Sequence, residues 1–162
     1  SSGHSIIRIR FLHLMMAKTE MERIVRQLEK TFQGHPWHGP SITQTLEGLT
    51  EQQSQQRIGK GHSILELVLH MIAWRTFVCD RLEGNDVADV AEDLNFPTDG
   101  RWPQAWQLLQ QSQHRLLSAV QKFPIEKLDE LVPNRRYTYY TMLHGVLQHD
   151  IYHLGQMVYL IK

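Results

Sequence analysis

The residues best suited to chemistry are two histidines four positions apart near the end of the chain, His149 and His153. In an α-helix, residues four apart lie about 40° apart around the axis and one turn along it, so both imidazoles can reach one ion. Met142, Val146 and Leu160 fall on the same stripe. The pair is therefore expected to point into an apolar seam, where an imidazole without a partner loses hydration. A bound metal ion is one way to satisfy both rings.

A third histidine, His70, lies in the most apolar segment of the chain. Taken alone, it is typical of a hydrogen-bonded core residue. Together with an inward-facing pair at His149 and His153, it completes three neutral nitrogen ligands on two helices. Three protein ligands leave a coordination position for water or substrate, which is typical of catalytic metal sites. The pattern predicts one divalent metal ion, but three imidazoles suit zinc, nickel, iron and manganese and do not distinguish them.

Two carboxylates lie close in sequence to these histidines, and no catalytic residue is assigned among them. Asp150 follows His149, and Glu66 precedes His70 by one helical turn. We interpret Asp150 as a helix-surface carboxylate or one that orients a ligand imidazole, in preference to a general base. Glu66 either orients His70 or serves only the capping box that it forms with Ser63.

Four further residues are candidates for lining a substrate pocket beside the histidines: Trp37, His38, Trp74 and Gln156. For Trp74 the alternative is a core position, because aromatic residues at helical spacing are more often core residues.

Apolar residues at helical spacing predict the elements that position these side chains. Long helices are expected over 18–33, 63–82, 102–123 and 138–162, with a brief helix over 41–47. The second of these is apolar almost all round, so it should be central. Residues 83–99 carry six acidic side chains and no lysine or arginine, and we expect a solvated surface loop there. No β-strand alternation of useful length occurs, so the sequence predicts an all-α fold, a four-helix bundle.

Composition limits the remaining possibilities. A chain of 162 residues fits a single domain. Its 17 basic and 17 acidic residues give no net charge, which removes the simplest argument for a nucleic-acid or anionic-membrane partner. No apolar run reaches about 18 residues, so no membrane span is expected. The single cysteine, Cys79, fits a reducing compartment, and we expect a cytoplasmic protein acting on a small molecule.

The two ends of the chain carry further expectations. Residues 1–15 are interpreted as a remnant of cloning or a poorly constrained segment, and 16–162 as the single helical domain. The last helix has a second apolar stripe, roughly opposite the histidines: Leu143, Leu147, Ile151, Leu154, Val158 and Ile161. A helix that is apolar on two faces must bury both, within the chain or against a second copy, and we expect a homodimer.

Several segments resemble the DinB/YfiT-like family of metal-dependent enzymes, which is distinct from the DNA polymerase that shares the DinB name. The resemblance rests on 37–41, 63–70 with Trp74, 81–84, 102–106 and 143–156, and the last segment is the specific one. It implies a four-helix bundle of the DinB/YfiT type, often dimeric, with a divalent metal held by three histidines. Matched position by position, these are His70, His149 and His153.

The resemblance also implies a class of reaction. Characterised members include transferases and isomerases that use a low-molecular-weight thiol such as bacillithiol or mycothiol. We therefore predict a divalent-metal-binding, metal-dependent enzyme, a thiol S-transferase or one catalysing a related transfer or hydrolysis on a small electrophile, with the thiol as cosubstrate. One alternative is a non-catalytic metal-binding or protein-interaction bundle. Another is a metal-free cluster of hydrogen-bonded histidines.

Overall fold

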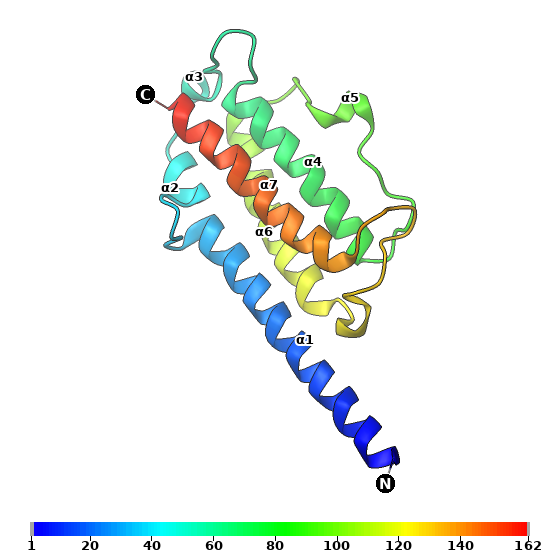
Figure 1. The fold of residues 1–162 in the computed structure, drawn as a ribbon. Coiled ribbons are helices and arrows are strands. Elements are labelled where there is room, and N and C mark those ends of the chain that lie inside the picture. The colour runs from blue at the N-terminus through cyan, green and yellow to red at the C-terminus, as the bar shows by residue number, and fades with distance from the viewer. Residues whose placement is uncertain (1, 162) are drawn as a thin grey trace.

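The computed structural model describes residues 2–161, which form helices joined by loops (Figure 1). Four long helices make a bundle: α1 (Ser2–Gln33), α4 (Ile64–Leu82), α6 (Trp102–Lys122) and α7 (Tyr139–Leu160). The connections contain the short helices α2 (Ile42–Leu46), α3 (Glu51–Ser54) and α5 (Glu92–Asn95), and the 3-10 turn η1 (Ile125–Lys127). The predicted all-α fold and four-helix bundle are confirmed.

Helix α4 packs against both α6 and α7. It begins with the predicted capping box, in which the Glu66 amide donates to the Ser63 hydroxyl and the Ser63 amide donates to the Glu66 carboxylate. It ends before Gly84, whose φ of +97° is a conformation that glycine adopts without steric cost. Most of its side chains are buried, as its nearly continuous apolar sequence predicts.

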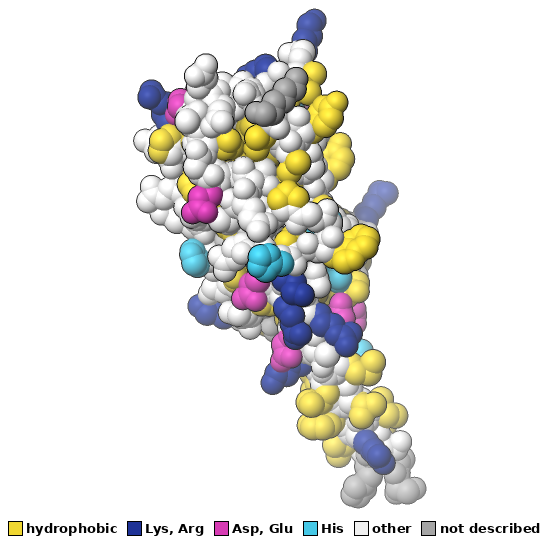
Figure 2. All heavy atoms as spheres, turned by 90° about the vertical axis from the view of Figure 1, so that its left-hand side faces the viewer, with side chains coloured by type: hydrophobic (Ala, Val, Ile, Leu, Met, Phe, Trp, Pro, Cys, Tyr) yellow, Lys and Arg dark blue, Asp and Glu magenta, His cyan; other side chains and the backbone are white. Residues whose placement is uncertain are grey.

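Helix α1 is longer than the periodicity indicated, because it starts at Ser2 rather than near residue 18. The first buried side chain among its described residues is Met21, and the large apolar side chains before it are exposed. Figure 2 shows them gathered on the part of α1 that projects from the bundle. No helix-breaking proline interrupts this stretch, so the helix continues beyond its tertiary contacts. No helix within residues 2–161 is long and apolar enough to cross a membrane.

Two apolar clusters fill the bundle, and a buried polar layer separates them along the helices. On α7, Val146 belongs to the first cluster and Leu154 to the second. His149, Asp150 and His153 fall between these two residues. The same change of cluster occurs on α4 between Met71 and Phe77 and on α6 between Leu109 and Leu116. The polar layer is therefore a shared level of the bundle, at which the candidate site lies.

Candidate metal centre

Three imidazoles from two helices meet where α4 packs on α7. The Nε2 atom of His149 lies 3.0 Å from Nε2 of His70 and 3.0 Å from Nε2 of His153. One ligand nitrogen of each residue lies within 4.8 Å of the other two. His70 and His153 are buried, and His149 is half-buried. The helical spacing of four brings the pair on α7 together, and the packing of α4 adds His70 to it.

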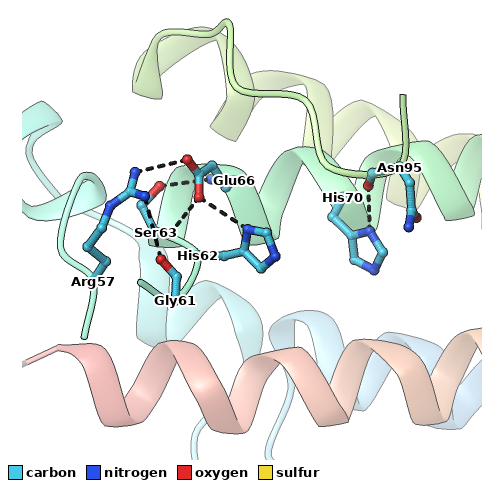
Figure 3. A network of polar contacts seen from close by, with 7 residues as sticks. All are labelled: Arg57, Gly61, His62, Ser63, Glu66, His70 and Asn95. Atoms are coloured by element: carbon cyan, nitrogen blue, oxygen red, sulfur yellow. Dashed lines mark hydrogen bonds and ion pairs between the residues drawn. The ribbon is translucent and has the colours of Figure 1, made fainter. Parts of the chain in front are cut away.

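Hydrogen bonds on the far side of two rings determine which nitrogen faces the centre. The Nδ1 atom of His70 lies 2.6 Å from the Asn95 carbonyl oxygen, and Nδ1 of His153 lies 2.6 Å from Oε1 of Gln156 (Figure 3 shows the first contact). Because both oxygens accept, each Nδ1 carries the proton and donates it. The Nε2 atoms of His70 and His153 are then unprotonated lone pairs directed at the centre.

These lone pairs fit a divalent cation better than they fit one another. A proton on Nε2 of His149 can form a well-aligned hydrogen bond to Nε2 of His70 or of His153, but not to both. A cation between the rings attracts all three lone pairs at once. Zinc–imidazole bonds of about 2.0–2.1 Å place the nitrogen ligands of one ion about 3 Å or slightly more apart, close to the observed separations. Nδ1 of His149 has no hydrogen-bond partner among the described residues, and this holds whether Nε2 of the ring carries a proton or binds a metal.

The three rings are neutral at neutral pH, which is the form that binds a metal. Burial lowers the pKa of His149 to about 4, and the neighbouring histidines and Arg75 act in the same direction. Burial also lowers the pKa of His70 and of His153. The hydrogen bonds to Asn95 and Gln156 oppose this effect because they favour the protonated ring.

Asp150 does not orient a ligand imidazole or stand ready as a base; it forms a buried ion pair with Arg75. Oδ2 of Asp150 accepts from the Arg75 guanidinium at 2.6 Å, and both side chains are at most 1% exposed. The same guanidinium donates to Ser112 and Gln113 on α6. The reason is the helical rotation of about 100° per residue, which turns Asp150 away from the face that carries His149.

Glu66 is likewise occupied away from the centre (Figure 3). Its carboxylate completes the capping box, accepts from Arg57 at 2.9 Å and lies 3.3 Å from Nδ1 of His62. Burial alone would raise the pKa of Glu66, but the Ser63 amide and the Arg57 guanidinium outweigh it and lower the pKa. Of the two sequence interpretations of Glu66, the structure shows the capping role and no hydrogen bond to His70.

The four pocket candidates separate into two pairs. Trp37 and His38 lie in the connection between α1 and α2 with exposed side chains, so they are not brought to the histidines. Trp74 is brought there, because it lies one turn after His70 on α4 and its ring meets that of His149 edge-on with 6.2 Å between centroids. Gln156 contacts the centre directly as the hydrogen-bond partner of His153.

The segment expected to be a solvated loop supplies two residues of the site that the sequence analysis missed. Asn95, the last residue of α5, accepts from His70 through its carbonyl and from the Trp74 indole through Oδ1 at 2.8 Å. Phe96 stacks between the rings of His62 and His70, with centroids 3.8 and 3.9 Å apart. The one available signal was an aromatic residue inside an acidic segment.

The fold and the site together define the class of this protein. It is a helical bundle whose polar level holds three inward-facing imidazoles compatible with metal binding. The family model of the DinB superfamily matches residues 37–157, which include all three histidines. The chain belongs to the DinB superfamily, as the sequence resemblance predicted. Neither a comparison with curated proteins nor one with solved structures gives a match.

Proposed function

We propose that this protein holds one divalent metal ion through His70, His149 and His153 and is a metal-dependent enzyme that transfers a thiol, or water, to a small electrophile. The observation that carries the proposal is the convergence of three Nε2 atoms, two of which are left unprotonated by their outer hydrogen bonds. Membership of the DinB superfamily supports it.

Each part of the centre has a role in this proposal. The imidazoles hold the ion, and Asn95 and Gln156 keep His70 and His153 in the tautomer that binds it. A divalent ion in this place supplies Lewis acidity, which lowers the pKa of a thiol or water. Three ligands from the chain leave positions for such a molecule. Phe96 stacks on the His70 ring, and Trp74 meets the rings of His70 and His149 edge-on.

The thiol in this proposal is a separate low-molecular-weight cosubstrate. The chain's own cysteine, Cys79, is buried in the first apolar cluster. Burial raises the pKa of its thiol to about 11, so it supplies almost no thiolate at neutral pH. An internal cysteine nucleophile is therefore disfavoured, whereas an external thiol or water remains compatible with the site.

Metal content tests the proposal directly. The native protein, purified without a histidine tag, is compared by mass spectrometry with a His149→Ala/His153→Ala variant and with His144→Ala as the control on the same helix. We expect about one equivalent of metal in the native protein and the control, and none in the double variant. Equal content in all three proteins would refute the three-histidine centre.

A second measurement separates an enzyme from a non-catalytic metal-binding bundle. We expect the cobalt-loaded protein to change its visible spectrum when a small thiol is added, because an open coordination position accepts the sulfur. Thiol-transfer and hydrolysis assays on model electrophiles then identify the reaction. A spectrum that no thiol or small anion alters would favour a structural ion.

We also propose that two copies of the chain associate. The second apolar stripe of α7 is partly satisfied within the chain, because Leu143 and Leu154 are buried. Other large side chains of the same helix remain exposed, with 66% exposure for Tyr152, 40% for Val158 and 76% for Tyr159. These three residues are the surface that we assign to a homodimer contact.

A further inference from the structure

A pocket of about 280 Å³ lies beside the three-histidine centre, between α4 and α7. These two helices lie side by side in Figure 1. Trp74, Phe77 and Val78 line the pocket from α4, and Met142, Gly145 and Val146 line it from α7. His149 belongs both to this lining and to the centre, so the pocket and the centre adjoin at this side chain.

Gly145 keeps the α7 wall of the pocket open. An added Cβ at this position meets no atom within 4 Å, so the space in front of the glycine is empty. Glycine weakens a helix interior because the unfolded chain has more freedom to lose. Gly145 is unfavourable for its helix and faces a cavity beside the centre. Such a glycine is typical of a site that leaves room for a ligand.

The lining carries no charge that could bind an ionic group. None of the described residues around the pocket is aspartate, glutamate, lysine or arginine. The polar groups of the lining are the hydroxyls of Tyr137 and Thr141 and the His149 imidazole, which can form hydrogen bonds but supply no opposite charge. A carboxylate, phosphate or ammonium group would therefore lose hydration there without gaining a counter-ion. Aromatic walls favour an aromatic guest, and Trp74 and Phe77 already meet edge-to-face with 5.4 Å between centroids.

We propose that this pocket binds the uncharged aromatic part of the substrate, one or two rings in size, with the reactive atom directed to the His149 end. The size follows from the volume, because an apolar cavity of about 150 Å³ accommodates benzene and drug-sized ligands need about 300–1,000 Å³. The direction of the reactive atom rests on the proposed function. The charged parts of a thiol cosubstrate must then reach the centre outside this pocket.

Binding of 2-naphthol, measured by titration calorimetry at neutral pH, tests the pocket. Gly145→Leu fills it, and because helical side chains lean toward the N-terminus, the new side chain leans away from His149. Gly155→Leu is the matched control, since Gly155 is an exposed glycine of the same helix whose added Cβ also meets nothing. Because Gly155 lies one turn from Tyr152 and Tyr159, the sedimentation of this variant is compared with that of the native chain. Leucine favours a helix more than glycine, so thermal melts should show both variants at least as stable as the native chain.

We expect 2-naphthol to bind the native protein and Gly155→Leu with a stoichiometry of one, and Gly145→Leu at least about tenfold more weakly. Naphthalene-2-sulfonate, which has the same rings and a negative charge, should bind the native protein at least about tenfold more weakly than 2-naphthol. Metal content should be the same in all three proteins.

Three outcomes would overturn the assignment: no binding of 2-naphthol to the native protein, equal binding to the two leucine variants, or equal binding of the sulfonate. Each of these leaves the metal result untouched. Conversely, native protein that binds 2-naphthol but holds no metal at the histidines would refute the proposed function and retain the pocket.

Discussion

At the scale of single residues, the centre is defined by where its protons are. Two imidazoles donate from Nδ1 to oxygens that accept, and burial keeps all three rings neutral. Burial keeps these rings unprotonated and so able to bind a metal, but it also lowers the stability of the fold in acid. The reason is that the unfolded chain binds protons on these histidines at a pH where the folded protein does not. Protonation and metal binding are thus opposed at the same atoms.

The metal-free protein should lose stability as the pH falls from about 6.5 to about 4. Burial lowers the pKa of His149 from 6.5 to about 4, so in this window the unfolded chain binds a proton that the folded chain does not. The free energy of unfolding therefore decreases with decreasing pH, on the order of 2–3 kcal/mol for His149. Denaturant unfolding of chelator-treated protein across this range measures it. A His149→Gln variant should show a shallower decrease, and an equal slope would contradict the assignment.

Gln156 should tune metal affinity without holding the metal. Replacement Gln156→Met removes the acceptor for Nδ1 of His153 and leaves the helix otherwise intact. Loss of such an outer hydrogen bond typically weakens metal affinity by about 10–100-fold. Competition with a chromogenic chelator measures the change. Gln148→Met, an exposed position of the same helix, is the control and should retain native affinity.

At the scale of elements, the contact between α4 and α7 determines whether there is a centre at all. His70 belongs to one helix and the pair belongs to the other, 79 residues away for His149. Arg75 and Asp150 connect these same two helices, and Ser112 and Gln113 extend the network to α6. Because a buried guanidinium needs all its partners, this network restricts how the helices can slide past one another.

Removing one partner of this pair should be strongly destabilising. In Asp150→Ala the Arg75 charge stays buried without its counter-ion, which typically costs about 3–5 kcal/mol of unfolding free energy. The double variant Arg75→Met/Asp150→Leu should lose much less, since no isolated charge remains. Urea unfolding measures both.

A surface ion pair provides the comparison for that prediction. Arg115 pairs with Asp80 at 2.6 Å, and both side chains are partly exposed. Asp80→Ala should cost less than about 1 kcal/mol, because solvent screens the pair. Equal losses in Asp80→Ala and Asp150→Ala would contradict the special role given to the buried pair.

At the scale of the whole molecule, the bundle and the projecting half of α1 are distinct. The exposed apolar residues of that half are Ile6, Ile7, Ile9, Phe11, Leu12, Leu14, Met15 and Met16, each at least 47% exposed (Figure 2). The bundle begins to bury α1 at Met21. The family match starts later still, at residue 37.

A chain that starts at Met16 should therefore fold and bind metal as the full chain does. Calorimetry should give the same melting temperature within about 2 °C, because no buried contact is removed. Metal content should stay the same. A clear decrease in either would show that the projecting residues support the bundle.

The homodimer can be tested with the same shortened chain. In analytical ultracentrifugation at micromolar concentration, we expect both chain lengths to sediment as dimers and a Tyr152→Ser/Tyr159→Ser variant as a monomer. Dimers of the full chain alone would assign the contact to α1 instead. Monomers throughout would refute the proposed association.

The sequence by itself determined what depends on spacing along one helix. Apolar periodicity indicated the four long helices, and the capping box at Ser63 and Glu66 marked the start of α4. The spacing of four placed His149 and His153 on one face. Such patterns can be recognised in a sequence because a helix has a fixed rotation per residue. The neighbours on its surface therefore follow from residue numbers alone. Among the long helices, the clear miss is the upstream half of α1, where the helix continues without burial.

Only the tertiary structure decided how the helices meet and what completes the centre. It brought His70 to the pair on α7, directed Asp150 to Arg75, and placed Asn95 and Phe96 against the His70 ring. The partner of His70 is a backbone carbonyl, which every residue has and which no residue type reveals. Contacts between distant segments depend on packing in three dimensions, and a single sequence carries no spacing rule for them.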